Sequence, residues 1–295
     1  MIKKLSKILL IIFFIIILII LYLSFIGVKT GKFNERINNR ILKINKNINL
    51  ELKEVKFLLN PYNLTINVTT KKPKILLEGN QILIKEIKTK ISLKSLIFDK
   101  FSINDLEIRT QEIKLNALIK LGRSFKNSTE LFLLDRFIKD GFLIANIKLN
   151  FDANGKIKDN YQINGFVKNS EFALLNKFNG KNLNFDFEIS KNKYTLKKVS
   201  VKFNDIDLSF PLIEANENNN LFLFNGKVET NEKDLDINQL DILFDGLMKK
   251  LDIEKINLSS VNKFSFNINK KLRLNDINID SKINLKKLVI KKNLL

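Results

Sequence analysis

The chain contains no cysteine, no histidine and no tryptophan among its 295 residues. Without cysteine or histidine, the protein can form no disulfide, no thiolate nucleophile, no Cys/His zinc site and no imidazole general base. The absence of cysteine is compatible with an oxidising compartment. The remaining routes to catalysis are a Ser–Lys dyad or a pair of carboxylates.

An S-x-x-K match runs from Ser260 to Lys263, but such a tetrapeptide is expected by chance in a chain this rich in serine and lysine. It leads into alternating apolar residues, which predict a strand, whereas the dyad requires a helix. Asp152 to Gly155 begins like a calcium loop but lacks its later acidic ligands, so we interpret it as a turn. We therefore predict that the protein is not an enzyme and has no metal and no cofactor.

Positive charge is abundant: 51 Lys and Arg face 31 Asp and Glu, a formal net charge of +20. Such an excess can indicate a nucleic acid or polyanion partner. The lysines, however, are scattered singly among Ile and Asn, with no arginine cluster and no interleaved aromatic residues to stack on bases. We therefore expect no nucleic acid partner, and a solvated lysine-rich surface that can attract acidic lipid headgroups.

One uninterrupted apolar run covers residues 8–28 and follows Lys3, Lys4 and Lys7. About 20 apolar helical residues span a bilayer core. The apolar region of a cleaved signal peptide, the alternative, is usually about 7 to 15 residues long. We predict a single-pass membrane anchor over residues 1–28 and a β-rich periplasmic domain over residues 29–295, because long downstream domains translocate largely regardless of charge. The expected location is a bacterial inner membrane.

The body is dominated by apolar residues that alternate with polar ones, which places one kind of side chain on each face of a strand. Asn154-Gly155, Asn179-Gly180 and Asn225-Gly226 match hairpin turns between such strands. We therefore predict a mainly β, one-sided antiparallel meander of short strands separated by polar breaks. The apolar residues expected to line its inner face are Leu183, Phe185, Phe187, Ile189, Val201, Phe203, Leu208, Phe264, Phe266, Ile268, Leu274 and Ile279.

Two stretches predict short amphipathic helices. Residues 127–130 resemble a capping sequence before apolar residues at helical spacing, and Asp140-Gly141 is the expected stop. The second helix is expected over residues 240–251, with Asn238 as its cap. Each helix either covers an open end of the sheet or binds a membrane surface or a partner.

Residues 82–97 (ILIKEIKTKISLKSLI) and residues 103–108 (INDLEI) follow the apolar N-terminal run, and residues 272–279 (LRLNDINI) echo the same pattern. This succession resembles the opening of the AsmA-like family of bacterial envelope proteins, the group that includes TamB and YhdP. The resemblance is specific over about residues 82–115.

The resemblance implies an elongated, curved antiparallel sheet of the β-taco type. Its apolar groove would hold phospholipid acyl chains and contribute to lipid transport and outer-membrane biogenesis. The 24 Phe, with only 4 Tyr, would give such a groove few polar groups. Three alternatives remain open from the residues alone. One is a closed sandwich core in place of the groove, and another is an envelope assembly or scaffold protein that binds a protein partner without moving lipid. The third is a polyanion binder that uses the +20 charge.

Overall fold

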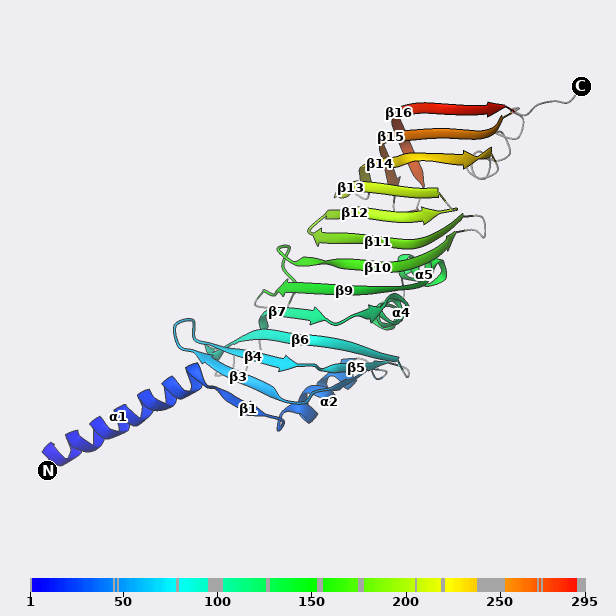
Figure 1. The fold of residues 1–295 in the computed structure, drawn as a ribbon. Helices are drawn as coiled ribbons and strands as arrows, with labels where there is room; N and C mark the ends of the chain where they lie inside the picture. The colour runs from blue at the N-terminus through cyan, green and yellow to red at the C-terminus, as the bar shows by residue number, and fades with distance from the viewer. Residues whose placement is uncertain are drawn as a thin grey trace, which may run out of the picture. The chain divides into compact units, whose positions relative to one another are not determined.

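The computed structural model describes residues 2–44, 46, 48–77, 80–94, 103–125, 128–152, 156–174, 178–204, 206–218, 221–237, 253–269, 271 and 273–290 (Figure 1). The protein is mainly β, with one large open antiparallel sheet and a few short helices, as the sequence predicted. The sheet order is β1-β3-β4-β6-β7-β9-β10-β11-β12-β13-β14-β15-β16, and β2, β5 and β8 pair beside this path.

Helix α1 (Ile2–Phe25) contains a stretch, Ser6–Phe25, that is long and apolar enough to cross a membrane. The body of the protein does not bury this stretch. The helix ends where the amides of Ile26 and Gly27 both donate to the Tyr22 carbonyl oxygen at 2.9 Å. Gly27 adopts a φ of +74°, which favours glycine at a helix C-terminus. Strand β1 (Val28–Thr30) follows directly, so the apolar helix leads straight into the sheet.

The body divides into two compact units, Met1–Gln111 with Ala145–Gln162, and Glu112–Ile144 with Ile163–Leu295. After α1 and β1, the first unit contains helix α2 and most of the early strands. Their bounds are α2 (Asn34–Ile44), β2 (Ile48–Glu51), β3 (Val55–Asn60), β4 (Thr65–Lys71), β5 (Lys74–Leu77), β6 (Asn80–Ser92) and β7 (Ile103–Thr110). Strand β9 (Ile138–Asn150) contributes residues to both units.

The first unit has one apolar and one charged sheet face, because each strand alternates. Directly opposed residues make an apolar row across β1, β3, β4, β6, β7 and β9: Val28, Phe57, Val68, Thr89, Leu106 and Leu149. The neighbouring positions make the charged row on the other face: Lys29, Lys56, Thr69, Lys88, Glu107 and Lys148. The predicted one-sided pattern is thus present in this unit.

The second unit is a meander in which each strand pairs with the next along the chain. Its strands are β8 (Ile113–Lys114), β10 (Gln162–Leu174), β11 (Phe178–Ser190), β12 (Lys193–Phe203), β13 (Ile206–Asn218), β14 (Leu221–Asp236), β15 (Ile253–Asn269) and β16 (Leu274–Ile290). Ile206, Leu235 and Ile256 form a buried cluster on β13, β14 and β15, and Leu208, Ile253 and Leu258 pack against it.

Two helices lie side by side in this unit, α4 (Leu115–Phe125) and α5 (Thr129–Phe137). The predicted cap of α5 is confirmed, because Ser128 Oγ accepts a hydrogen bond from the Leu131 amide. The predicted stop is wrong: the helix ends at Phe137, and Gly141 lies inside β9. Leu115, which continues the alternation of Ile113, begins α4. The predicted helix over residues 240–251 lies outside the described residues.

Two of the three predicted hairpin turns are wrong. Gly180 lies inside β11 and Gly226 inside β14. A Cβ added at these glycines would come within 2.1 Å of Phe172 Cε1 and 2.3 Å of Phe264 Cζ, so each glycine makes room for the ring on the neighbouring strand. Asn154-Gly155 lies outside the described residues, although Phe151 and Ile157 on either side form a β-bridge.

Long strands replace the short ones that the sequence predicted. The alternation changes phase after Leu196 and after Leu274, which suggested breaks between separate strands. The structure instead places Lys198 and Asp276 at these points inside continuous strands, with φ of +53° at each. Such irregular residues shift the phase of a strand without ending it, and they bend it.

Candidate functional site

A row of directly opposed residues crosses six strands of the second unit. From β11 to β16 it consists of Phe187, Leu196, Ile213, Gly226, Phe264 and Ile279. Directly opposed residues of an antiparallel pair lie on the same face. We call the side of the sheet that carries this row the apolar face.

A second row runs beside the first on the same face and is rich in aromatic residues. It consists of Ile189, Tyr194, Ala215, Phe224 and Phe266. The Phe224 and Phe266 rings stack with centroids 4.9 Å apart, and Phe264 stacks on Phe266 at 5.9 Å. The Phe210 ring meets Phe264 edge-on at 6.3 Å. These aromatic contacts join β13, β14 and β15 into one hydrophobic surface.

The predicted groove residues of the bent half of β12 and β13 lie on this face too. Val201 opposes Leu208, and Phe203 opposes Ile206. Leu208 packs against the cluster that contains Ile256. Ile256 shares the apolar face with Phe264, because both lie at even spacing on a regular stretch of β15. The Phe203 ring stacks on Phe178 at 5.8 Å.

Burial of the predicted residues is uneven. Phe187 and Val201 are buried, with 7% and 8% of their surface exposed. The edge-strand residues Leu274 and Ile279 are 51% and 61% exposed. The remaining predicted residues are half-buried: Leu183, Phe185, Ile189, Phe203, Leu208, Phe264, Phe266 and Ile268. The apolar face is therefore best covered near β11 and β12 and most open at β16.

A group of three polar side chains interrupts the apolar face, and the alternation of the sequence did not predict it. Thr230 and Ser260 oppose each other on β14 and β15, and their hydroxyl oxygens lie 3.0 Å apart. The Asn262 amide nitrogen donates to Ser260 Oγ at 2.9 Å. Because the three side chains form hydrogen bonds with one another, these polar groups can remain on this half-buried surface.

No catalytic dyad forms at Ser260. Ser260 and Lys263 lie on β15 at a spacing of three residues, so they lie on opposite faces of the strand. Ser260 is half-buried on the apolar face, and Lys263 is exposed. Among the described residues, no group of three or more acidic side chains could hold a metal ion.

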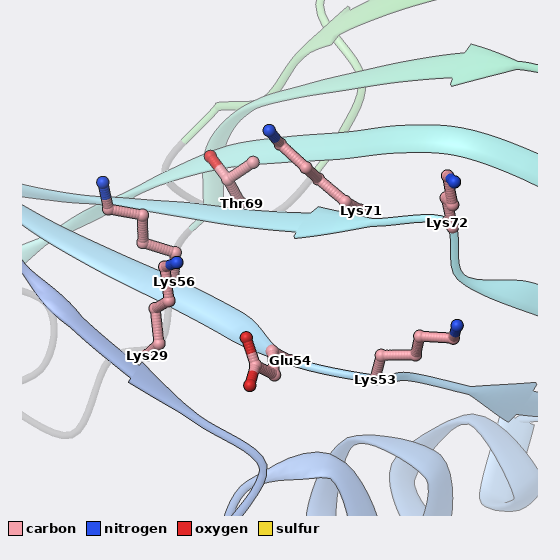
Figure 2. A pocket seen from close by; sticks show the side chains of 7 residues that line it. All are labelled: Lys29, Lys53, Glu54, Lys56, Thr69, Lys71 and Lys72. Atoms are coloured by element: carbon pink, nitrogen blue, oxygen red, sulfur yellow. The ribbon is translucent and has the colours of Figure 1, made fainter.

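A surface hollow with a basic lining lies in the first unit, close in sequence to α1. It is lined by Lys29, Lys53, Glu54, Lys56, Thr69, Lys71 and Lys72, and Figure 2 shows their side chains around it. Lys29, Lys56 and Thr69 are directly opposed on β1, β3 and β4. Within the described part of the chain, no salt bridge joins these lysines to a carboxylate. We call this site the lysine hollow.

The lysine hollow has the chemistry of an anion site. Five ammonium groups face one carboxylate, that of Glu54. Lysine binds phosphate as a mobile point charge. These lysines are scattered in the sequence, because Lys29, Lys53 and Lys71 are far apart in the chain and only strand pairing brings them together.

No family model, no curated protein and no solved structure matches the chain.

Proposed function

We propose that this protein is a lipid-binding protein of the bacterial envelope, anchored in the inner membrane by α1 with its body in the periplasm. Its apolar face holds phospholipid acyl chains, and it contributes to phospholipid transport toward the outer membrane. This is the function that the resemblance to the AsmA-like family implies.

The observation that carries the proposal is the partial burial of the apolar face. In a closed sandwich, inward side chains interdigitate and are nearly fully buried. Phe264, Phe266 and Ile268 are instead half-buried, and Ile279 beside them is exposed. Apolar patches that are exposed in this way mark binding sites on the surfaces of soluble proteins. Phenylalanine rings without polar groups are suited to hydrocarbon.

The N-terminal region supports a retained anchor. Strand β1 begins at Val28 and pairs with β3 within three residues of the end of α1. A Cβ at Gly27 would lie 2.3 Å from the Phe57 carbonyl oxygen, so the end of the helix is packed against the sheet. Such a packed junction is a poor site for a signal peptidase, which needs an accessible extended segment.

Site-specific photocrosslinking tests lipid binding directly. A benzophenone amino acid replaces Phe264 on the apolar face or Lys263 on the opposite face of the same strand. The full-length protein is then irradiated in membranes and analysed by mass spectrometry. We expect phospholipid adducts at position 264 and few at position 263. Equal labelling at both positions, or protein adducts alone at position 264, would contradict the proposal.

The lysine hollow leads to a second prediction. We expect the double variant Lys29→Glu/Lys56→Glu to lose the preference of the protein for anionic over zwitterionic phospholipid by about tenfold or more, because each lysine near an anionic surface contributes about 1 kcal/mol. The measurement is the ratio of phosphatidylglycerol to phosphatidylcholine retained by full-length protein from equimolar nanodiscs. Lys168→Glu/Lys181→Glu makes the same charge change on β10 and β11 and is the control; an equal effect there would show that net charge alone sets the preference.

A further inference from the structure

In the part of the chain that the structure describes, strand β16 is an edge of the sheet. Among the described residues it pairs only with β15. Seven of its eight apolar side chains are 43% to 62% exposed: Leu274, Ile277, Ile279, Ile283, Leu285, Leu288 and Ile290. A long hydrophobic edge strand readily pairs with another strand, so natural proteins usually protect it.

Over residues 274–288, the apolar positions of β16 are symmetric about Ser281. Ile279 and Ile283 lie two residues away on either side, Ile277 and Leu285 lie four away, and Leu274 and Leu288 lie seven away. The irregularities of the strand follow the same symmetry. One extra residue relative to β15 occurs near Asp276, and another occurs at Lys286, so both bulges lie about five residues from Ser281.

Four of the five charges of β16 are antisymmetric about the same residue, and the fifth, Lys287, falls opposite Asn275. Asp276 and Asp280 precede Ser281, whereas Lys282 and Lys286 follow it at the same distances. Reversing the strand about Ser281 therefore superposes apolar residues on apolar residues, bulge on bulge, and each acid on a base. A strand with this pattern is complementary to an antiparallel copy of itself.

We propose that β16 pairs with β16 of a second copy of this chain, antiparallel and about a two-fold axis through Ser281. In this register Ile279 opposes Ile283 of the second copy, and Ile277 opposes Leu285. On the other face Asp280 opposes Lys282 of the second copy, and Asp276 opposes Lys286. Opposite charges directly across an antiparallel pair are favourable, and the contact is closed and self-complementary, as in most homodimers.

Other registers fit less well. Moving the axis from Ser281 to Ile283 places Ile279 opposite Lys287. Asp280 would then oppose Lys286, but Asp276 and Lys282 would both lose their charged partners. A parallel pair in register would place Asp280 beside Asp280 and Lys282 beside Lys282, which is unfavourable. The antiparallel register about Ser281 is thus favoured by both hydrophobic and charge pairing. It also continues the apolar face of one copy into that of the other, because opposed residues share a face.

Single cysteines test the register, since the chain has none of its own. Ser281→Cys in the full-length protein places two thiols directly across the axis, where Cβ atoms lie about 4.5 to 5.5 Å apart. We expect a covalent dimer on oxidation or with a short bis-maleimide. Asn284→Cys is the control: its thiols would lie about 20 Å apart, six residues along the strand, and should not crosslink. Absence of the Ser281→Cys dimer, or equal crosslinking by the control, would overturn the proposed register.

Charge reversal tests the pairing itself. We expect Lys282→Asp to weaken the dimer of the full-length protein in detergent at least tenfold by mass photometry, and the double variant Asp280→Lys/Lys282→Asp to restore it. A wild-type protein that stays monomeric over micromolar concentrations, or a Ser281→Cys variant that crosslinks only to a different protein, would overturn the proposal. Neither result would bear on lipid binding by the apolar face, so this inference and the proposed function fail separately.

Discussion

Replacing Phe266 with aspartate should abolish lipid binding while leaving the protein folded. Phe266 is half-buried in the aromatic stack with Phe224 and Phe264, so a carboxylate at this position can still reach solvent. On the proposed lipid path, however, it would put a charge where acyl chains lie. We expect the amount of copurified phospholipid to fall at least tenfold with little change in the thermal unfolding temperature of the full-length protein.

The same substitution at Phe187 should behave differently. Phe187 is only 7% exposed, so an aspartate there would be buried without a partner, at a cost of several kcal/mol. That cost is a large share of the roughly 5 to 15 kcal/mol that stabilises a typical domain. Ser265→Asp, on the opposite face of β15, is the control for added charge. If Phe266→Asp unfolds the protein as severely as Phe187→Asp, the face is closed and the lipid path is rejected.

A large loss of stability is expected from Gly141→Ala. Gly141 has a φ of +132°, and a Cβ there would lie 2.7 Å from Ser170 Cα and 2.9 Å from Leu115 Cδ1. Strained backbone and overpacking each cost about 1 to 3 kcal/mol. Ser170 is fully buried on β10, so the neighbouring strand has no room to move away. We expect the midpoint of chemical unfolding, followed by near-ultraviolet circular dichroism, to fall sharply.

Gly122→Ala is the matched control for this prediction. Gly122 lies inside α4, and an added Cβ would meet only the Leu131 methyl groups at 3.4 Å. Alanine in a helix interior is favoured over glycine by about 0.5 to 1 kcal/mol. The Gly122→Ala protein should therefore be as stable as wild type or slightly more stable. Similar destabilisation by both variants would mean that close strand packing at Gly141 is not the cause.

Alternation was enough to predict the sheet and its two kinds of face. Each strand is amphipathic by itself, so Phe185 and Phe187, or Phe264 and Phe266, could be assigned to a face without knowing the fold. The helix α1 could also be predicted from the sequence, because an apolar run of that length without a charge rarely forms anything but a helix.

The glycines and the shorter helices could not be assigned in this way. An Asn-Gly pair is a strong turn signal by local geometry, but Gly180 and Gly226 each make room for a Phe ring on another strand, which only the register reveals. Leu115 and Ile119 fit a helix, yet Leu115 also extends the alternation of Ile113. The lysine hollow was hidden for the same reason as the glycine contacts, since β1, β3 and β4 bring its lysines together.

The nearest-neighbour pairing from β10 to β16 has a consequence for evolution and for folding. Each strand is held chiefly by the strands next to it in the chain, as repeats are in a solenoid. A hairpin could thus be gained or lost at the β16 end without rearranging the strands before it. The same pairing is local in sequence, which favours rapid folding and would let each strand join its predecessor as the chain is synthesised.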